Sequence, residues 1–164
     1  MLKTTFSDSR NELCCVDELL MAMKIGQDIF DYINTVRNPN SKQTMKRRVQ
    51  EHQPKLDIVE KFSTIDTRYF MVVFSAEWNG ECRAQIPSLA KLLIAAKNSN
   101  ISVKVVDFDE NRDIAEEMRV LRIPAIVIHD KSWREIGRFV EKPQHGATLE
   151  EELWDIISKP ANTK

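Results

Sequence analysis

The stretch WNGEC, residues 78–82, joins two apolar segments that have different patterns. Residues 69–75 (YFMVVFS) precede it and are rich in β-forming residues with no polar alternation, which predicts a strand covered on both faces. After it, apolar residues recur at helical spacing between residues 86 and 96. We therefore expect WNGEC to lie where a helix begins directly after a buried strand.

The segments downstream of this junction alternate between strand and helix patterns. Strands are predicted at residues 101–108, 123–129 and 133–140, and helices at residues 110–120 and 148–157. The element order is then β-α-β-α-β-β-α, a parallel crossover unit followed by an antiparallel pair. This order predicts an α/β fold with a central mixed four-stranded sheet and helices on both of its faces.

The N-terminal third of the chain has a helical pattern. Apolar residues recur at helical spacing from residue 13 to residue 33, and the breaker-rich segment NPNS, residues 38–41, ends this first helix. Asn40 or Ser41 can cap a second helix, which Pro54 bends or divides into two.

The chain is long enough for one domain with an appendage, since it has 164 residues. We expect residues 1–64 to form a helical N-terminal extension that packs on the core, and residues 65–160 to form the main domain. This boundary coincides with the change from purely helical to alternating patterns.

The composition excludes several classes of protein. The 24 basic and 25 acidic side chains nearly cancel, which argues against a nucleic-acid-binding domain. No apolar run approaches the ~18–20 residues that span a bilayer, so no membrane insertion is expected. The first residues, MLKTTFSDSRNELCC, lack the apolar core of a secretion signal, and we expect a cytoplasmic protein.

The three cysteines, Cys14, Cys15 and Cys82, cannot all pair within the chain. An odd count without a signal peptide is typical of a reducing compartment, where thiols stay free. Cys14 and Cys15 lie in a helical pattern, where packing as small apolar side chains is favoured over a role as a redox partner of Cys82.

Cys82 is the candidate reactive group. If Asn79 caps the helix, residues 80–82 occupy its first turn, where free backbone N–H groups and the helix dipole lower the pKa of a thiol. Burial in apolar surroundings raises that pKa, and the sequence leaves the balance open. Asn79 also has a purely structural role available, because its side-chain oxygen can accept a hydrogen bond from the N–H of Glu81 or Cys82.

Two segments resemble the thioredoxin superfamily. Its active-site pattern, V-x-F-x-A-x-W-C-G-x-C-x4-P, is similar to VVFSAEWNGECRAQIP at residues 72–87. The family's cis-proline segment is similar to VLRIPAIVIHD at residues 120–130. The resemblance covers roughly residues 66–158, and the element order of the family also agrees.

This resemblance implies a thioredoxin-like fold and thiol–disulfide exchange with protein thiols or disulfides, with glutathione as a further candidate partner. It implies neither a metal nor a cofactor. Cys82 would be the catalytic residue, within an active-site motif that also contains Trp78, Asn79, Gly80 and Glu81. Ile123 and Pro124 would lie opposite this motif, where the backbone beside the cis-proline of family members pairs with an extended substrate peptide.

Two of the groups that make the family catalytic are absent from this sequence, and Val140 stands where the last strand usually has a glycine. Asn79 stands where the family has its attacking cysteine, and Val73 stands where it has a buried acid that accepts a proton from the inner thiol. The scaffold of a disulfide oxidoreductase therefore lacks its outer nucleophile, which leaves open whether the chain is an enzyme.

Three hypotheses follow from this degenerate motif. In the first, Cys82 is accessible, forms mixed disulfides and is released by a thiol from outside the chain. The alternative is a non-catalytic binding module or chaperone that captures extended peptide at the Ile123–Pro124 edge. In a third, the chain is a variant of a dithiol oxidoreductase with cysteine at position 79.

Overall fold

The computed structural model describes residues 16–159, which contain one four-stranded sheet. The strand order is β2-β1-β3-β4, with β1 and β2 parallel and the other two pairs antiparallel. This is the predicted mixed sheet. Its strands are β1 (Tyr69–Ser75), β2 (Ile101–Asp107), β3 (Ala125–His129) and β4 (Glu135–Val140).

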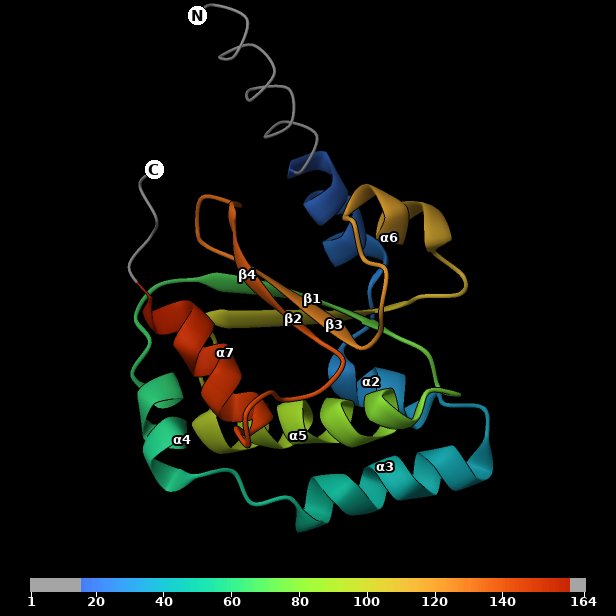
Figure 1. Cartoon of the computed structure of the whole chain (residues 1–164), viewed down its shortest axis with the longest axis horizontal. Coiled ribbons are helices and arrows are strands. Elements are labelled where there is room, and N and C mark those ends of the chain that lie inside the picture. The colour runs from blue at the N-terminus through green and yellow to red at the C-terminus, as the bar shows by residue number, and fades with distance from the viewer. Residues whose placement is uncertain (1–15, 160–164) are drawn as a thin grey trace, which may run out of the picture.

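Helices cover both faces of this sheet, as predicted (Figure 1). On one face, α5 packs against α2, α3, α4 and α7, whereas α6 and the helix of residues 16–25 lie on the other face. The labelled helices are α2 (Ile29–Asn34), α3 (Pro39–Glu51), α4 (Leu56–Ser63), α5 (Gly80–Ala96), α6 (Arg112–Glu117) and α7 (Leu149–Ser158).

Strand β1 lies inside the sheet and carries the centre of the core. Residues 71–74 are all 0 % exposed. Successive side chains of a strand point to opposite faces, so burial of four in a row requires cover on both sides. This explains why the strand shows no polar alternation, and it places the WNGEC motif directly after a strand whose last five residues are buried.

The first helix, predicted to run from residue 13 to residue 33, is interrupted, so its predicted length was wrong. Residues 16–25 are helical, but the backbone of Gln27 then pairs with Val105 of β2 through two hydrogen bonds of 2.8 Å. Gly26 permits this approach, since its backbone lies close to Lys104. The side chain of Asp28 then caps a new helix, α2.

The cap of α3 also differs from the prediction. Asn38, rather than Asn40 or Ser41, is the cap, and its side chain accepts a 3.0 Å hydrogen bond from the N–H of Ser41. Pro39 occupies the first helical turn, where its missing N–H costs nothing. Beyond α3, the segment containing Pro54 divides the pattern into two helices, α3 and α4.

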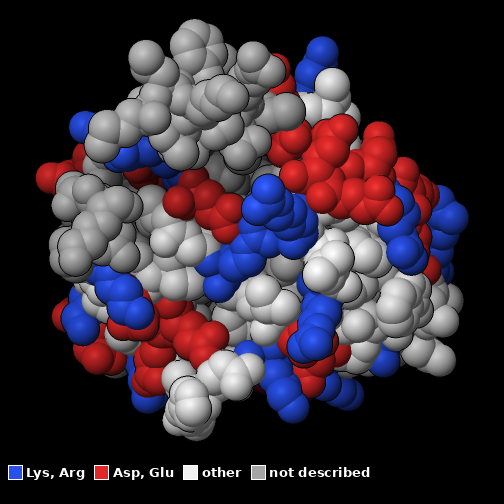
Figure 2. Space-filling view, turned by 45° about the horizontal axis from the view of Figure 1, so that its top comes forward, with Lys and Arg blue, Asp and Glu red and all other residues white. Residues whose placement is uncertain are grey.

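Acidic and basic side chains lie side by side over the face of the molecule that Figure 2 shows. Within residues 16–159, no helix is long and apolar enough to cross a membrane. Cys14 and Cys15 lie outside the described residues, and the expected domain boundary between residues 64 and 65 stays a prediction.

We expect Gly26→Ala to destabilise the fold by about 1–3 kcal/mol. A Cβ atom at this position would lie 2.7 Å from the Cβ of Lys104 and 2.8 Å from the carbonyl oxygen of Ala22. Urea denaturation measures the effect. Gly80→Ala is the matched control, because the nearest atom there is Arg83 Nη2 at 3.8 Å. Equal stability of the two variants would contradict the proposed close approach.

Candidate functional site

Asn79 caps α5 at the point where β1 has ended and the helix begins. Its Oδ1 accepts a hydrogen bond of 2.9 Å from the backbone N–H of Cys82. The prediction that Asn79 caps this helix is confirmed. The cap uses an N–H group that would otherwise be free to stabilise a thiolate. Asn79, at the position of the family's attacking cysteine, therefore has a structural role.

The side chain of Cys82 is 0 % exposed. Burial raises the pKa of its thiol, and hydrogen bonds with the Ala76 backbone and the Ser75 side chain lower that pKa by less. The nearby charges of Arg83 and Glu81 act in opposite directions and are smaller effects. Burial thus decides the balance that the sequence left open, and this structure encloses the thiol that the single-cysteine hypothesis expected to be accessible.

Two buried hydroxyl groups adjoin Cys82. Ser75, the last residue of β1, is 0 % exposed, and its Oγ lies 2.8 Å from the Oη of Tyr32 in α2. Burial raises the pKa of Tyr32 well above its ordinary range, so its hydroxyl stays protonated. Val73, at the position of the family's acid, is a fully buried apolar residue of the same strand. The sequence patterns did not single out Ser75 or Tyr32, although Ser75 is a polar end to an apolar strand.

The loop that carries the motif is held by polar contacts on two sides. The indole N–H of Trp78 donates a 2.7 Å hydrogen bond to Asp109, and this bond holds the pKa of that carboxyl below its ordinary value. The carboxylate of Glu77 accepts a 2.7 Å hydrogen bond from the backbone N–H of Arg37. Trp78 nevertheless remains 61 % exposed, so most of its ring is available for contact.

The Ile123–Pro124 segment lies beside this loop, because the start of β3 pairs with the end of β1 through Phe74 and Ala125. The peptide bond between Ile123 and Pro124 is cis. Both residues are buried, and Ile123 is 6 % exposed. Leu121, just before them, is 86 % exposed, and the sequence patterns had not marked it as a binding residue.

A pocket of about 570 Å³ opens beside the motif. It is bordered by the N-terminal segment, the β1–α5 loop and the β2–α6 loop, with a lining that includes Tyr32, Glu77, Trp78, Asp107 and Asp109. Within residues 16–159, no group of three or more His, Cys, Asp or Glu side chains could hold a metal ion.

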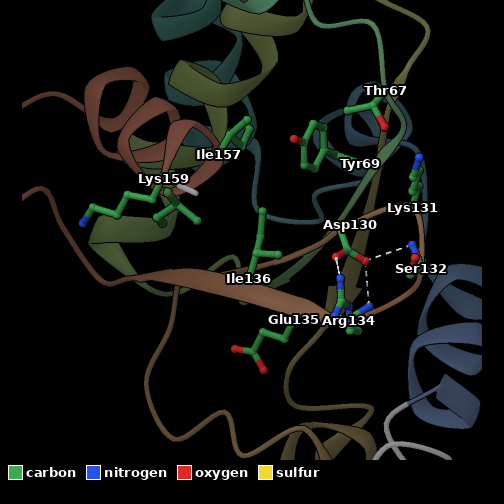
Figure 3. A pocket seen from close by; sticks show the side chains of 11 residues that line it. Thr67, Tyr69, Asp130, Lys131, Ser132, Arg134, Glu135, Ile136, Ile157 and Lys159 are labelled. Carbon is green, nitrogen blue, oxygen red and sulfur yellow. Dashed lines mark hydrogen bonds and ion pairs between the residues drawn. The ribbon is translucent and has the colours of Figure 1, made fainter. Parts of the chain in front are cut away.

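A second pocket, of about 700 Å³, lies at the opposite end of β1, between the β3–β4 turn and the end of α7 (Figure 3). Asp130 occupies its centre, where its carboxylate accepts hydrogen bonds from the backbone N–H groups of Ser132 and Arg134 and pairs with the Arg134 guanidinium. These contacts shape the hairpin turn. Of these two pockets, the one that Tyr32 lines includes a residue of the motif, Trp78, and the other does not.

A family model described as thioredoxin matches residues 26–154. The chain belongs to the thioredoxin family. The match begins within the segment that was expected to be an N-terminal extension. Family membership gives the chain a thiol-redox role at the level of the family, whose members act on protein thiols or disulfides.

Two relatives in sequence agree with this assignment. A thioredoxin from Chlamydia pneumoniae is 33% identical over 99 residues, which cover 60% of this chain and 89% of that protein. An H-type thioredoxin from Fagopyrum esculentum is 34% identical over 73 residues, covering 44% of this chain and 60% of that protein.

The fold is also similar to that of two solved structures at low sequence identity. One, a protein of unknown function from Pseudomonas aeruginosa, has a TM-score of 0.65 at 20% identity and covers 75% of this chain and 76% of its own. The other, an HIV epitope scaffold, has a TM-score of 0.67 at 18% identity and covers 84% of this chain and 87% of its own. These likenesses concern the fold alone.

We expect iodoacetamide to label Cys82 in the native protein at pH 8 at least roughly tenfold more slowly than in urea-unfolded chain. Burial restricts access, and the raised pKa leaves less thiolate at this pH than in the unfolded chain. The rate should keep rising as the pH passes 9.0, the ordinary pKa of a cysteine thiol. Mass spectrometry of a Cys14→Ser, Cys15→Ser protein isolates the Cys82 signal, and equal native and unfolded rates would contradict the enclosure.

Proposed function

We propose that this chain binds extended protein segments at the Ile123–Pro124 edge and does not by itself reduce disulfides. The observation that carries the proposal is the backbone of Ile123. Within residues 16–159, neither its N–H nor its carbonyl has a hydrogen-bond partner. Such groups pair with an added extended peptide, which satisfies their hydrogen bonds as a further strand would.

Apolar surface beside these backbone groups supports the same role. Leu121 is 86 % exposed and precedes Ile123 by two residues, and Trp78 is 61 % exposed on the neighbouring loop. When an extended peptide is bound as an added strand, main-chain hydrogen bonds supply affinity and contacts with its alternate side chains supply specificity. A bound segment would thus be held through its main chain and through alternate apolar side chains.

The residues at the outer and inner positions of the motif, Asn79 and Cys82, favour peptide binding over catalysis. Reduction of a disulfide transfers two electrons and leaves two thiols oxidised, so one chain needs two sulfur atoms to complete it. Here Asn79 fills the outer position and Cys82 is enclosed. Peptide capture requires neither sulfur.

A second candidate is thiol–disulfide exchange through Cys82 alone. The thiolate would attack a disulfide R–S–S–R′ to form a Cys82–S–S–R bond and release R′–S⁻, which takes up a proton. A thiol from glutathione or a protein would then release Cys82 and form a new disulfide with R. The Ala76 backbone and the Ser75 side chain favour this candidate, because both lower the pKa of the Cys82 thiol, although by less than burial raises it.

We expect the unaltered chain to show no dithiothreitol-coupled reduction of insulin above background, and Asn79→Cys to gain measurable turnover. The variant supplies a second sulfur one helical turn before Cys82, which makes two-electron exchange possible. Asn79→Cys combined with Cys82→Ser is the control and should lose the gain. Insulin reduction by the unaltered chain at the rate of Asn79→Cys would overturn the non-catalytic role.

Peptide capture can be measured with fluorescent, reduced and carboxymethylated α-lactalbumin, an unfolded probe that has no free thiol. We expect Leu121→Glu to weaken binding roughly tenfold, because it places a charge on the apolar contact surface. Leu56→Glu is the matched control, since Leu56 is a 79 % exposed leucine on α4.

The same assay tests capture apart from thiol chemistry, because this probe offers Cys82 neither a thiol nor a disulfide. Cys82→Ala should leave the affinity for this probe unchanged if capture is non-covalent. Equal binding by Leu121→Glu and Leu56→Glu would exclude capture at the Ile123–Pro124 edge.

A further inference from the structure

The loop that carries the peptide edge, residues 118–124, has few hydrogen bonds at its centre. Within residues 16–159, no backbone–backbone hydrogen bond involves Leu121, Arg122 or Ile123. Leu121 is 86 % exposed, so its side chain is not fixed by packing either. Backbone that lacks hydrogen bonds and buried contacts opens easily. Contacts from other parts of the chain must therefore hold this loop in place.

Arg138 of β4 holds the start of the loop. Its Nη1 donates a 3.0 Å hydrogen bond to the carbonyl oxygen of Arg119, and its Nη2 donates one of 3.1 Å to the carbonyl oxygen of Met118. These two residues directly follow α6. The carbonyl groups at the end of a helix have no partner within it, so the guanidinium supplies donors that the helix lacks.

A carboxylate orients this guanidinium. Arg138 Nε and Nη2 donate hydrogen bonds of 2.6 Å and 2.9 Å to the two carboxylate oxygens of Glu135. The Arg138 side chain is only 27 % exposed, and its backbone pairs with Val127 of β3. A planar guanidinium held by a carboxylate presents its other N–H groups in a fixed direction, which a lysine ammonium cannot do.

The end of the loop is held by the residue that follows β4. The N–H of Glu141 donates a 2.7 Å hydrogen bond to the carbonyl oxygen of Pro124. At the other end, Arg119 has a φ of 57°, a left-handed conformation that is costly for a residue with a side chain and persists where contacts hold it. The exposed Leu121 and the unpaired backbone of Ile123 thus lie between two attachments to the β4 region.

We propose that Arg138 is a positioning residue for peptide capture, because it holds the loop in the conformation that presents Leu121 together with the backbone of Ile123. The inference rests on the proposed function and adds to it a residue that acts through the loop. Without the two hydrogen bonds from Arg138, the loop samples other conformations. The affinity for a segment then falls in proportion to the fraction of loops that can still bind it.

The test uses the carboxymethylated α-lactalbumin probe, under conditions in which circular dichroism shows each variant to be folded. We expect Arg138→Ala to weaken binding roughly fivefold to tenfold. Arg138→Lys should weaken it nearly as much, because an ammonium keeps the charge but cannot reach Glu135 and both carbonyl groups at once. Arg134→Ala is the matched control, since Arg134 pairs with Asp130 at the other end of the hairpin.

A double variant distinguishes positioning from a general loss of stability. In chains that already carry Arg138→Ala, Leu121→Glu should weaken binding by less than about twofold, because Leu121 is no longer held in the binding conformation. Full addition of the two effects would overturn the proposal, as would unchanged binding by Arg138→Ala. If Arg138→Ala does not fold, unchanged binding by Arg138→Lys overturns it instead.

Failure of the proposed function gives a different result from failure of this inference alone. If capture does not occur at this edge, Leu121→Glu binds the probe as well as Leu56→Glu does, and the inference fails with it. If Leu121→Glu weakens binding and Arg138→Ala does not, capture at the edge stands and the role of Arg138 is excluded.

Discussion

The hydrogen bond from the N–H of Cys82 to the side chain of Asn79 fixes the first turn of α5 against the end of β1, and the rest of the site is arranged around that turn. It sets Cys82 in the interior, beside the hydroxyl of Ser75. In a dithiol member of the family the outer position would hold a reactive sulfur. Here it holds Asn79, whose side-chain oxygen already accepts the capping hydrogen bond. That bond stabilises the helix end by about 1 kcal/mol, and the position has no nucleophile.

The site draws on the whole chain more than the five-residue motif suggests. Two hydrogen bonds hold the loop after β1. Glu77 accepts one from the backbone N–H of Arg37, and Trp78 donates the other to Asp109. Tyr32 reaches Ser75 from a helix that also belongs to the N-terminal segment. The family match likewise begins at residue 26, before any strand of the sheet. The N-terminal helices therefore help to form the surroundings of the thiol as well as covering the sheet.

The sheet and the site differ in how far the sequence could predict them. The apolar run of β1 and the cap at Asn79 are local patterns, and both were predicted from adjacent residues. Contacts between distant segments were not, because Tyr32 and Ser75 are separated by 43 residues and only the packed fold brings them together. The break after the first helix was missed for a related reason. The helical spacing of apolar residues continues through Gly26. The backbone of Gln27 nevertheless pairs with Val105 of β2, and the helix ends before it. The pKa of Cys82 depends on a balance between burial and hydrogen bonding that no sequence pattern encodes.

The two departures from the family pattern are physically consistent with each other. A buried acid beneath the inner thiol is useful when that thiol must lose its proton to resolve a disulfide made by the outer one. An unpaired carboxylate in the same place is costly, because a buried charge loses its hydration without gaining a partner. With Asn79 in the outer position no disulfide forms between the two motif positions, and Val73 avoids that cost. Ser75 and Tyr32 are neutral and hydrogen-bonded to each other, so they can remain next to the sulfur without a desolvated charge. A site with one thiol can thus keep neutral hydroxyl groups in the interior after both the partner sulfur and the acid are gone.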